Sequence, residues 1–263
     1  MAELTERATF TILVTILLFL LLTFDVQFGL IFSLFLIANV LFYLLDNKVT
    51  YPIERGGSGK LKTALWALGG FFAFTFLSKP LLSLFKIPVG NVNSVIELYS
   101  QYIPFFSQIT PALENNPLLT ALGFGIVVTV VETVYFNGRL YEAITDQLKI
   151  NTQTFNWRNL LVAFGVIPAV ATAFHFSVRG IDVAATSGLV LTFLFFSISQ
   201  FIVIKRRQIL DAIGMHTSAN TTAIVVKLGI SSLQPVFLPL IFIVGFYFII
   251  RTHTVSSILS RNI

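Results

Sequence analysis

Three ionisable side chains and one amide lie inside long apolar stretches of this chain. Glu132 follows Val-Val-Thr-Val-Val, His175 lies in Ala-Thr-Ala-Phe-His-Phe, and His216 begins His-Thr-Ser-Ala-Asn, which ends at Asn220. The four-residue spacing puts His216 and Asn220 on one face of a helix. Peptide hydrolysis needs a base for water, a proton shuttle and hydrogen-bond donors for the oxyanion. A carboxylate, two imidazoles and an amide supply these groups.

Each of these residues also has a purely structural interpretation. The glutamate can be a neutral packing residue, a histidine near the end of a span can be interfacial, and a His/Asn pair can join helices by hydrogen bonds. Two His and one Glu can also bind zinc with an open position. The His-Glu-x-x-His signature is absent, so metal-free chemistry with no cofactor is favoured. The chain has no cysteine, which excludes thiol catalysis.

The composition explains why these polar residues are informative. Of the 263 residues, 56% are hydrophobic and only 11% are charged, less than half the usual charged share of a soluble domain. Such a chain lacks the polar surface of a soluble enzyme, a disordered protein or a nucleic-acid-binding domain. We therefore predict an integral membrane protein that is a single membrane domain over residues 1–263, with the lipid bilayer as its surroundings. An ionisable group at membrane depth then suggests a functional site.

The elements that must position these residues are membrane-spanning helices. We predict an all-α, polytopic bundle of about eight transmembrane helices. The seventh apolar run contains many polar residues, so it belongs in the bundle interior rather than against lipid. The eight runs are Ala8–Phe24, Phe28–Leu45, Thr63–Ser78, Leu118–Phe136, Leu160–Val178, Val183–Ile204, Ile209–Ile230 and Val236–Ile250.

The basic residues indicate the orientation of these spans. With the N-terminus in the cytoplasm and eight crossings, most Lys and Arg residues fall in cytoplasmic segments, including Lys205, Arg206 and Arg207. This agrees with the positive-inside rule. Both termini are therefore predicted to be cytoplasmic.

Helix lengths decide whether the polar residues can meet. The fourth helix is predicted to continue past Glu132 to about Leu148, and the fifth to begin near Trp157. Glu132 and His175 then lie at a similar height, roughly 25 Å from the connecting hairpin. His216 is much nearer the preceding turn, so all three meet only if the hairpin 139–158 protrudes by about 10 Å.

Three motifs in this order resemble the CPBP family of intramembrane glutamic proteases, which includes the type 2 CAAX prenyl proteases and the bacteriocin-processing Abi proteins. Glu132 begins a segment similar to the first motif, Glu-Glu-x-x-x-Arg. His175 matches the histidine of the second, Phe-x-x-x-His, with Ala171 in place of the phenylalanine, and His216 to Asn220 fit the third, His-x-x-x-Asn. The resemblance covers about residues 118–226, which we interpret as a protease core. It implies an intramembrane endopeptidase with Glu132, His175, His216 and Asn220 at the active site, acting on peptides or prenylated proteins.

The chain departs from the family at supporting positions. Thr133 stands for the second glutamate and Asn137 for the arginine, so the supporting pair is interpreted as lost. Arg139, seven residues after Glu132, is predicted to share its helix face and to replace the arginine as a charge partner. These departures leave open a non-catalytic membrane scaffold, and mid-membrane Glu and His also suit a proton-coupled transporter. The short loops favour a prokaryotic plasma membrane.

Overall fold

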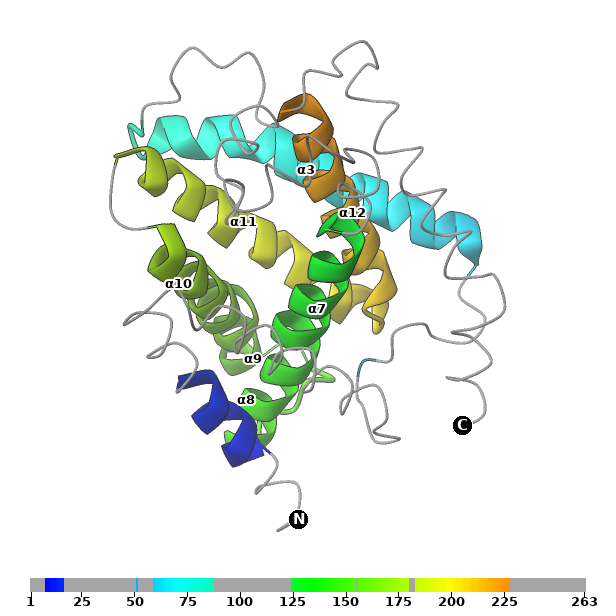
Figure 1. The fold of residues 1–263 in the computed structure, drawn as a ribbon. Coiled ribbons are helices and arrows are strands. Elements are labelled where there is room, and N and C mark those ends of the chain that lie inside the picture. Colours follow the sequence, from blue (N-terminus) through cyan, green and yellow to red (C-terminus); the bar gives the residue numbers. More distant parts are fainter. Residues whose placement is uncertain are drawn as a thin grey trace.

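The described part of the chain is helical. The computed structural model describes residues 8–16, 51, 59–87, 124–154, 156–179 and 183–227. Within these ranges the chain forms helices and turns and contains no strand, and the helices pack as a bundle (Figure 1). The all-α prediction is therefore confirmed. The predicted spans 28–45 and 236–250 and both termini lie outside the described residues, so the count of eight helices and the orientation stay predictions.

The helix that carries Glu132 runs without interruption from residue 124 to residue 147. Its extension past Glu132 to about Leu148 is as predicted. It alternates between π- and α-helical geometry, which the apolar periodicity did not predict. A π-helix has i→i+5 hydrogen bonds and often occurs at functional sites. The four segments are η2 (Phe124–Val128), α7 (Thr129–Glu132), η3 (Thr133–Leu140) and α8 (Tyr141–Gln147).

The helix that carries His175 begins at Trp157, also as predicted. Its segments are α9 (Trp157–Leu161), η4 (Val162–Val166) and α10 (Ile167–Arg179). The side chain of Asn156 accepts a hydrogen bond from the backbone N–H of Asn159 at 2.8 Å, which is the usual way an N-cap satisfies a free helix donor. The hydroxyl of Tyr141 donates to the side chain of Asn159. This bond joins the two arms of the hairpin near its tip.

A tight turn joins α11 (Val183–Arg206) to α12 (Leu210–Lys227). Arg207 has a left-handed backbone, with φ of 57°. Beyond it, the carboxylate of Asp211 lies 2.6 Å from Nε of Arg206 and accepts a second hydrogen bond, also 2.6 Å long, from Gln208. Asp211 therefore closes the turn, which explains one acidic residue in an otherwise apolar run.

Helix α12 lies in the interior of the bundle. All residues from 210 to 223 are buried, including His216, Asn220 and the threonines between and beyond them. The prediction that this polar run avoids lipid is therefore confirmed. Two of its four hydroxyls donate to backbone carbonyls one turn earlier, Ser218 to Gly214 at 2.8 Å and Thr221 to Thr217 at 2.6 Å.

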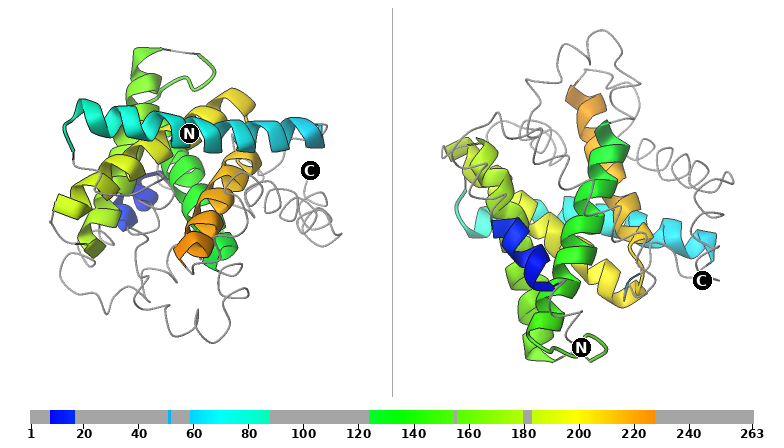
Figure 2. Two further views of the ribbon diagram at one scale, coloured as in Figure 1. Left: turned by 90° about the horizontal axis from the view of Figure 1, so that it is seen from above. Right: turned by 60° about the horizontal axis from the view of Figure 1, so that its bottom comes forward.

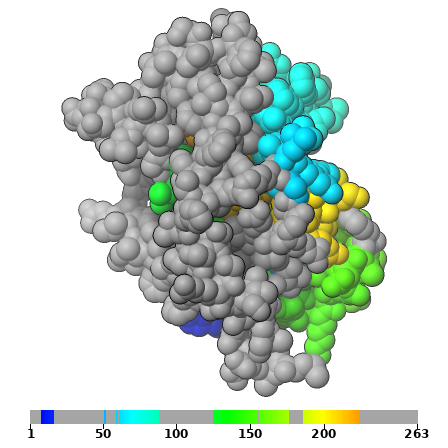
Figure 3. Space-filling view, turned by 90° about the vertical axis from the view of Figure 1, so that its right-hand side faces the viewer, coloured from blue at the N-terminus to red at the C-terminus, as the bar shows by residue number. Residues whose placement is uncertain are grey.

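Helix α3 (Lys60–Leu84) crosses α11 and α12 and lies at the molecular surface (Figures 2 and 3). The crossing is close at Gly70, where an added Cβ would overlap Ile202 and come within 2.7 Å of the sulfur of Met215. Within the described residues, three helices are long and apolar enough to cross a membrane: Leu61–Leu84, Trp157–His175 and Thr186–Arg206.

In Figure 1 the hairpin between α8 and α9 lies below the turn that joins α11 to α12. The protrusion of this hairpin from the membrane by about 10 Å stays a prediction.

Candidate active site

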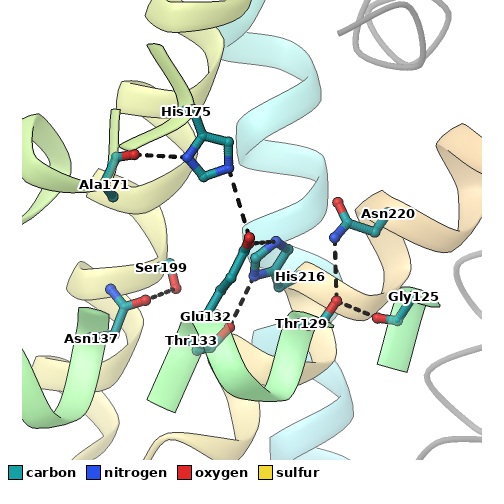
Figure 4. Close-up of polar contacts among 10 residues, drawn as sticks. All are labelled: Gly125, Thr129, Glu132, Thr133, Asn137, Ala171, His175, Ser199, His216 and Asn220. Atoms are coloured by element: carbon teal, nitrogen blue, oxygen red, sulfur yellow. Dashed lines mark hydrogen bonds and ion pairs between the residues drawn. The ribbon is translucent and has the colours of Figure 1, made fainter. Parts of the chain in front are cut away.

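Glu132, His175 and His216 meet at one point between three helices (Figure 4). One carboxylate oxygen of Glu132 lies 3.9 Å from Nε2 of His175, and the other lies 3.6 Å from Nε2 of His216. The side chain of Glu132 is 20% exposed, against 12% for His175 and 3% for His216. Three of the four residues predicted from the sequence are thus brought together in a largely enclosed place. Separations of this size suit groups bridged by a water molecule.

The ring of His175 is oriented by its own helix. Its Nδ1 lies 2.7 Å from the carbonyl oxygen of Ala171, one turn earlier. A carbonyl oxygen only accepts hydrogen bonds, so Nδ1 carries the proton in this contact. In the neutral ring the lone pair is then on Nε2, which faces Glu132 (Figure 4). His175 is therefore set to accept a proton on the side of the carboxylate.

His216 is enclosed by aromatic rings and held by one hydroxyl. The ring centroids of Phe195 and Phe196 lie 4.6 and 5.8 Å from that of its imidazole. Its Nδ1 lies 2.9 Å from Oγ1 of Thr133, which follows Glu132 in the chain. Two successive residues of one helix therefore contact the two nitrogens of this imidazole.

Asn220 lies one turn beyond His216 on α12. It donates to Oγ1 of Thr129 at 3.3 Å, and the hydroxyl of Thr129 donates to the carbonyl of Gly125 (Figure 4). Thr129 lies one turn before Glu132 on the same helix. Asn220 is thus placed at the neighbouring turn of the site, held by a threonine that the sequence analysis did not identify.

The family's supporting Glu and Arg are absent from this chain, but both substituted residues make hydrogen bonds. Thr133 bonds His216, as described above. Asn137 is fully buried and donates to the side-chain oxygen of Gln200 at 2.7 Å, while it accepts from the hydroxyl of Ser199 at 3.1 Å. These bonds join the helix of Glu132 to α11. The supporting positions have different side chains but still connect the helices.

The predicted role of Arg139 as the charge partner of Glu132 is also wrong. Arg139 interacts electrostatically with Tyr135 and Asp146. The physical reason is η3, which lies between Glu132 and Arg139. Its wider turns change the angle between successive residues, so a seven-residue spacing no longer returns to the same helix face.

Sequence reasoning missed the residues that enclose the site. Ser199 and Gln200 are two consecutive polar residues in an apolar span, a signal of the same kind that identified Glu132. Phe195 and Phe196 gave no such signal, because the chain has 28 phenylalanines and nothing in the sequence separates these two.

The arrangement of the His, Asp and Glu side chains is relevant to the alternative that the site binds zinc. In the part of the chain that the structure describes, no three His, Asp or Glu side chains are arranged to hold a metal ion. What the arrangement offers instead is a carboxylate flanked by two imidazoles. Such a group can remove a proton from a bound water and return it to a leaving group.

A model of the family described as type II CAAX prenyl endopeptidase Rce1-like matches residues 114–222. This segment contains Glu132, His175, His216 and Asn220, and the match confirms the family predicted from the three motifs. No curated protein and no solved structure significantly matches the chain. The family and the apolar helices together indicate an integral membrane protein, and the matched family supports a protease.

Proposed function

We propose that the chain, whose residues 114–222 match the Rce1-like family of type II CAAX prenyl endopeptidases, is an intramembrane endopeptidase whose nucleophile is a water activated by Glu132. The observation that carries this proposal is the position of the Glu132 carboxylate, 3.9 Å from one imidazole and 3.6 Å from another. Residues 118–226 form the protease core in this proposal.

Each group of the site has a role in the proposed hydrolysis. Glu132 and His175 hold a water between them, and this pair takes one of its protons as the oxygen attacks the peptide carbonyl. The N–H of His216 and the amide of Asn220 donate hydrogen bonds to the oxyanion that forms. The pair then returns the proton to the leaving nitrogen as the peptide bond breaks, which yields a carboxylate and an amine.

The proposed substrates are peptides or prenylated proteins at a membrane, including CAAX-type C-termini and bacteriocin leaders. A membrane site suits them because the buried helices carry enough polar side chains to admit water to a bond that lipid would otherwise keep dry. The proposed location is a prokaryotic plasma membrane, with both termini in the cytoplasm.

The two alternative functions, a non-catalytic scaffold and a proton-coupled transporter, have less support. A non-catalytic scaffold was favoured by the substitutions at Thr133 and Asn137, yet both residues bond the site. For a transporter, no specific feature of the described residues adds support beyond the intramembrane Glu and His themselves.

The test is cleavage of a panel of farnesylated and unprenylated peptides by the purified protein in detergent, with products identified by mass spectrometry. We expect cleavage by the native protein and none by Glu132→Ala. Equal cleavage by both would contradict the proposed function. The same assay after exhaustive chelation separates the mechanisms, because a zinc enzyme would lose activity and recover it when zinc is added.

A further inference from the structure

Among the residues that the structure describes, the hydroxyl of Thr133 has one hydrogen-bond partner, His216. Thr133 is fully buried, and in the described part of the chain its side chain contacts one hydrogen-bonding group, Nδ1 of His216 at 2.9 Å. Buried hydroxyl protons are almost always donated, because an unsatisfied one costs free energy. The hydroxyl of Thr133 therefore donates to Nδ1.

This bond determines which nitrogen of His216 carries hydrogen. If Nδ1 accepts, its lone pair is occupied and the ring proton must be on Nε2. Nε2 is the atom that lies 3.6 Å from the carboxylate of Glu132. The N–H of His216 thus points to the side where the carboxylate lies.

His175 has the opposite arrangement. Its Nδ1 carries the proton, because the group that it contacts is the carbonyl oxygen of Ala171. Its Nε2, 3.9 Å from the same carboxylate, therefore presents a lone pair in the neutral ring. His216 and His175 therefore differ in hydrogen bonding beside Glu132. Nε2 of His216 can donate to a bound molecule, whereas Nε2 of His175 can accept from it.

We propose that Thr133 is a positioning residue that holds His216 in the Nε2–H tautomer, so that His216 donates and His175 accepts at the two sides of Glu132. The assignment of these two roles in catalysis rests on the proposed function, whereas the tautomers do not. The family motif has a glutamate where this chain has Thr133. An ionised carboxylate only accepts hydrogen bonds, so the substitution replaces an acceptor with a donor, and the proposal applies to this chain in particular.

The tautomers are measured directly by NMR on protein labelled with ¹⁵N-histidine in detergent micelles, with the His216 signals assigned by their loss in His216→Asn. We expect Nε2–H for His216 and Nδ1–H for His175 in the native protein. Thr133→Ser should retain the His216 tautomer, and Thr133→Val should shift His216 toward Nδ1–H. Nδ1–H for His216 in the native protein would overturn the proposal, whether or not any variant folds.

Kinetics supply the second measurement. Thr133→Val should lower kcat by about tenfold, as expected when one hydrogen bond that orients a reacting group is lost, and leave KM nearly unchanged. Thr133→Ser should restore most of kcat. The matched control is Thr145→Val, because the hydroxyl of Thr145 is also buried but bonds only backbone carbonyls of its own helix.

Loss of kcat in Thr133→Ser equal to that in Thr133→Val would overturn the positioning role. If the native protein cleaves no substrate, the proposed function fails, while the NMR result still decides the tautomer.

Discussion

Nε2 of His216 lies 3.6 Å from a carboxylate oxygen of Glu132. This separation is longer than a direct hydrogen bond and short enough for one water to contact both groups. The two residues come from different helices, α7 and α12, and the contact depends on how closely these helices pack. The arrangement of the site is therefore sensitive to substitutions between the helices that do not touch the reacting groups.

Gly125 is the first such position. An added Cβ there would lie 2.6 Å from Oγ1 of Thr221, so η2 and α12 must separate or Thr221 must turn away from its own hydrogen bond. Gly125 also supplies the carbonyl that holds Thr129, the partner of Asn220. Gly125→Ala should lower kcat/KM by about tenfold or more, because displacements near 1 Å at an active site have large effects on rate.

The matched control for this change is Gly69→Ala. Gly69 lies in α3, and an added Cβ would have no neighbour within 4 Å. Alanine is also the better helix former. We expect native activity and equal or slightly higher thermal stability for Gly69→Ala. Equal activity of the two variants would show that the contact between η2 and α12 does not control the site.

Restoring the arginine of the family motif should damage this protein. Asn137 is fully buried, and both its amide hydrogen and its oxygen are bonded to neighbours on α11. Asn137→Arg places a larger, charged side chain in that space, next to Ser199 and Gln200 rather than a carboxylate. A buried charge without a partner is strongly destabilising, so we expect a clear fall in Tm in detergent.

The comparison for Asn137→Arg is Gln153→Arg, which adds the same charge at an exposed position in the hairpin. Thermal unfolding should distinguish the two variants, with Gln153→Arg close to native. A native Tm and native activity in Asn137→Arg would mean that the hydrogen bonds of Asn137 to α11 contribute little.

The turn between α11 and α12 positions α12, and with it His216, relative to α11. Asp211→Ala removes a buried carboxylate that accepts from Arg206 and Gln208, and it leaves the guanidinium of Arg206 without its partner. Breaking a buried ion pair from one side costs about 3–5 kcal/mol. Chemical unfolding should show a loss of this order for Asp211→Ala and little change for Asp146→Ala, which is exposed. Similar losses in both would contradict this role for the ion pair.

The sequence predicted the centre of the site because ionisable residues are conspicuous in an apolar chain. Glu132, His175 and His216 were identified in this way, and the buried position of α12 followed from its polar side chains. The continuation of the Glu132 helix to about Leu148 and the start of the His175 helix near Trp157 were also predicted from the sequence. These features depend on local composition, which a single sequence contains.

Other features depend on geometry that a single sequence does not specify. The π-helical turns of η3 are not visible in an apolar periodicity, and they made the prediction for Arg139 wrong. Thr133 and Asn137 were interpreted as losses because a motif compares residue identities. Whether a substituted side chain finds a new partner depends on its distance to residues on other helices, here His216, Ser199 and Gln200.

The most direct test of the account compares Glu132→Gln with Asp146→Asn, two carboxylate-to-amide changes on one continuous helix. Glutamine keeps the size of Glu132 but cannot act as a base, so we expect a loss of kcat of about 10²-fold or more with native Tm. Asp146→Asn should keep native activity. Native kcat in the folded Glu132→Gln protein would contradict the claim that Glu132 activates the attacking water.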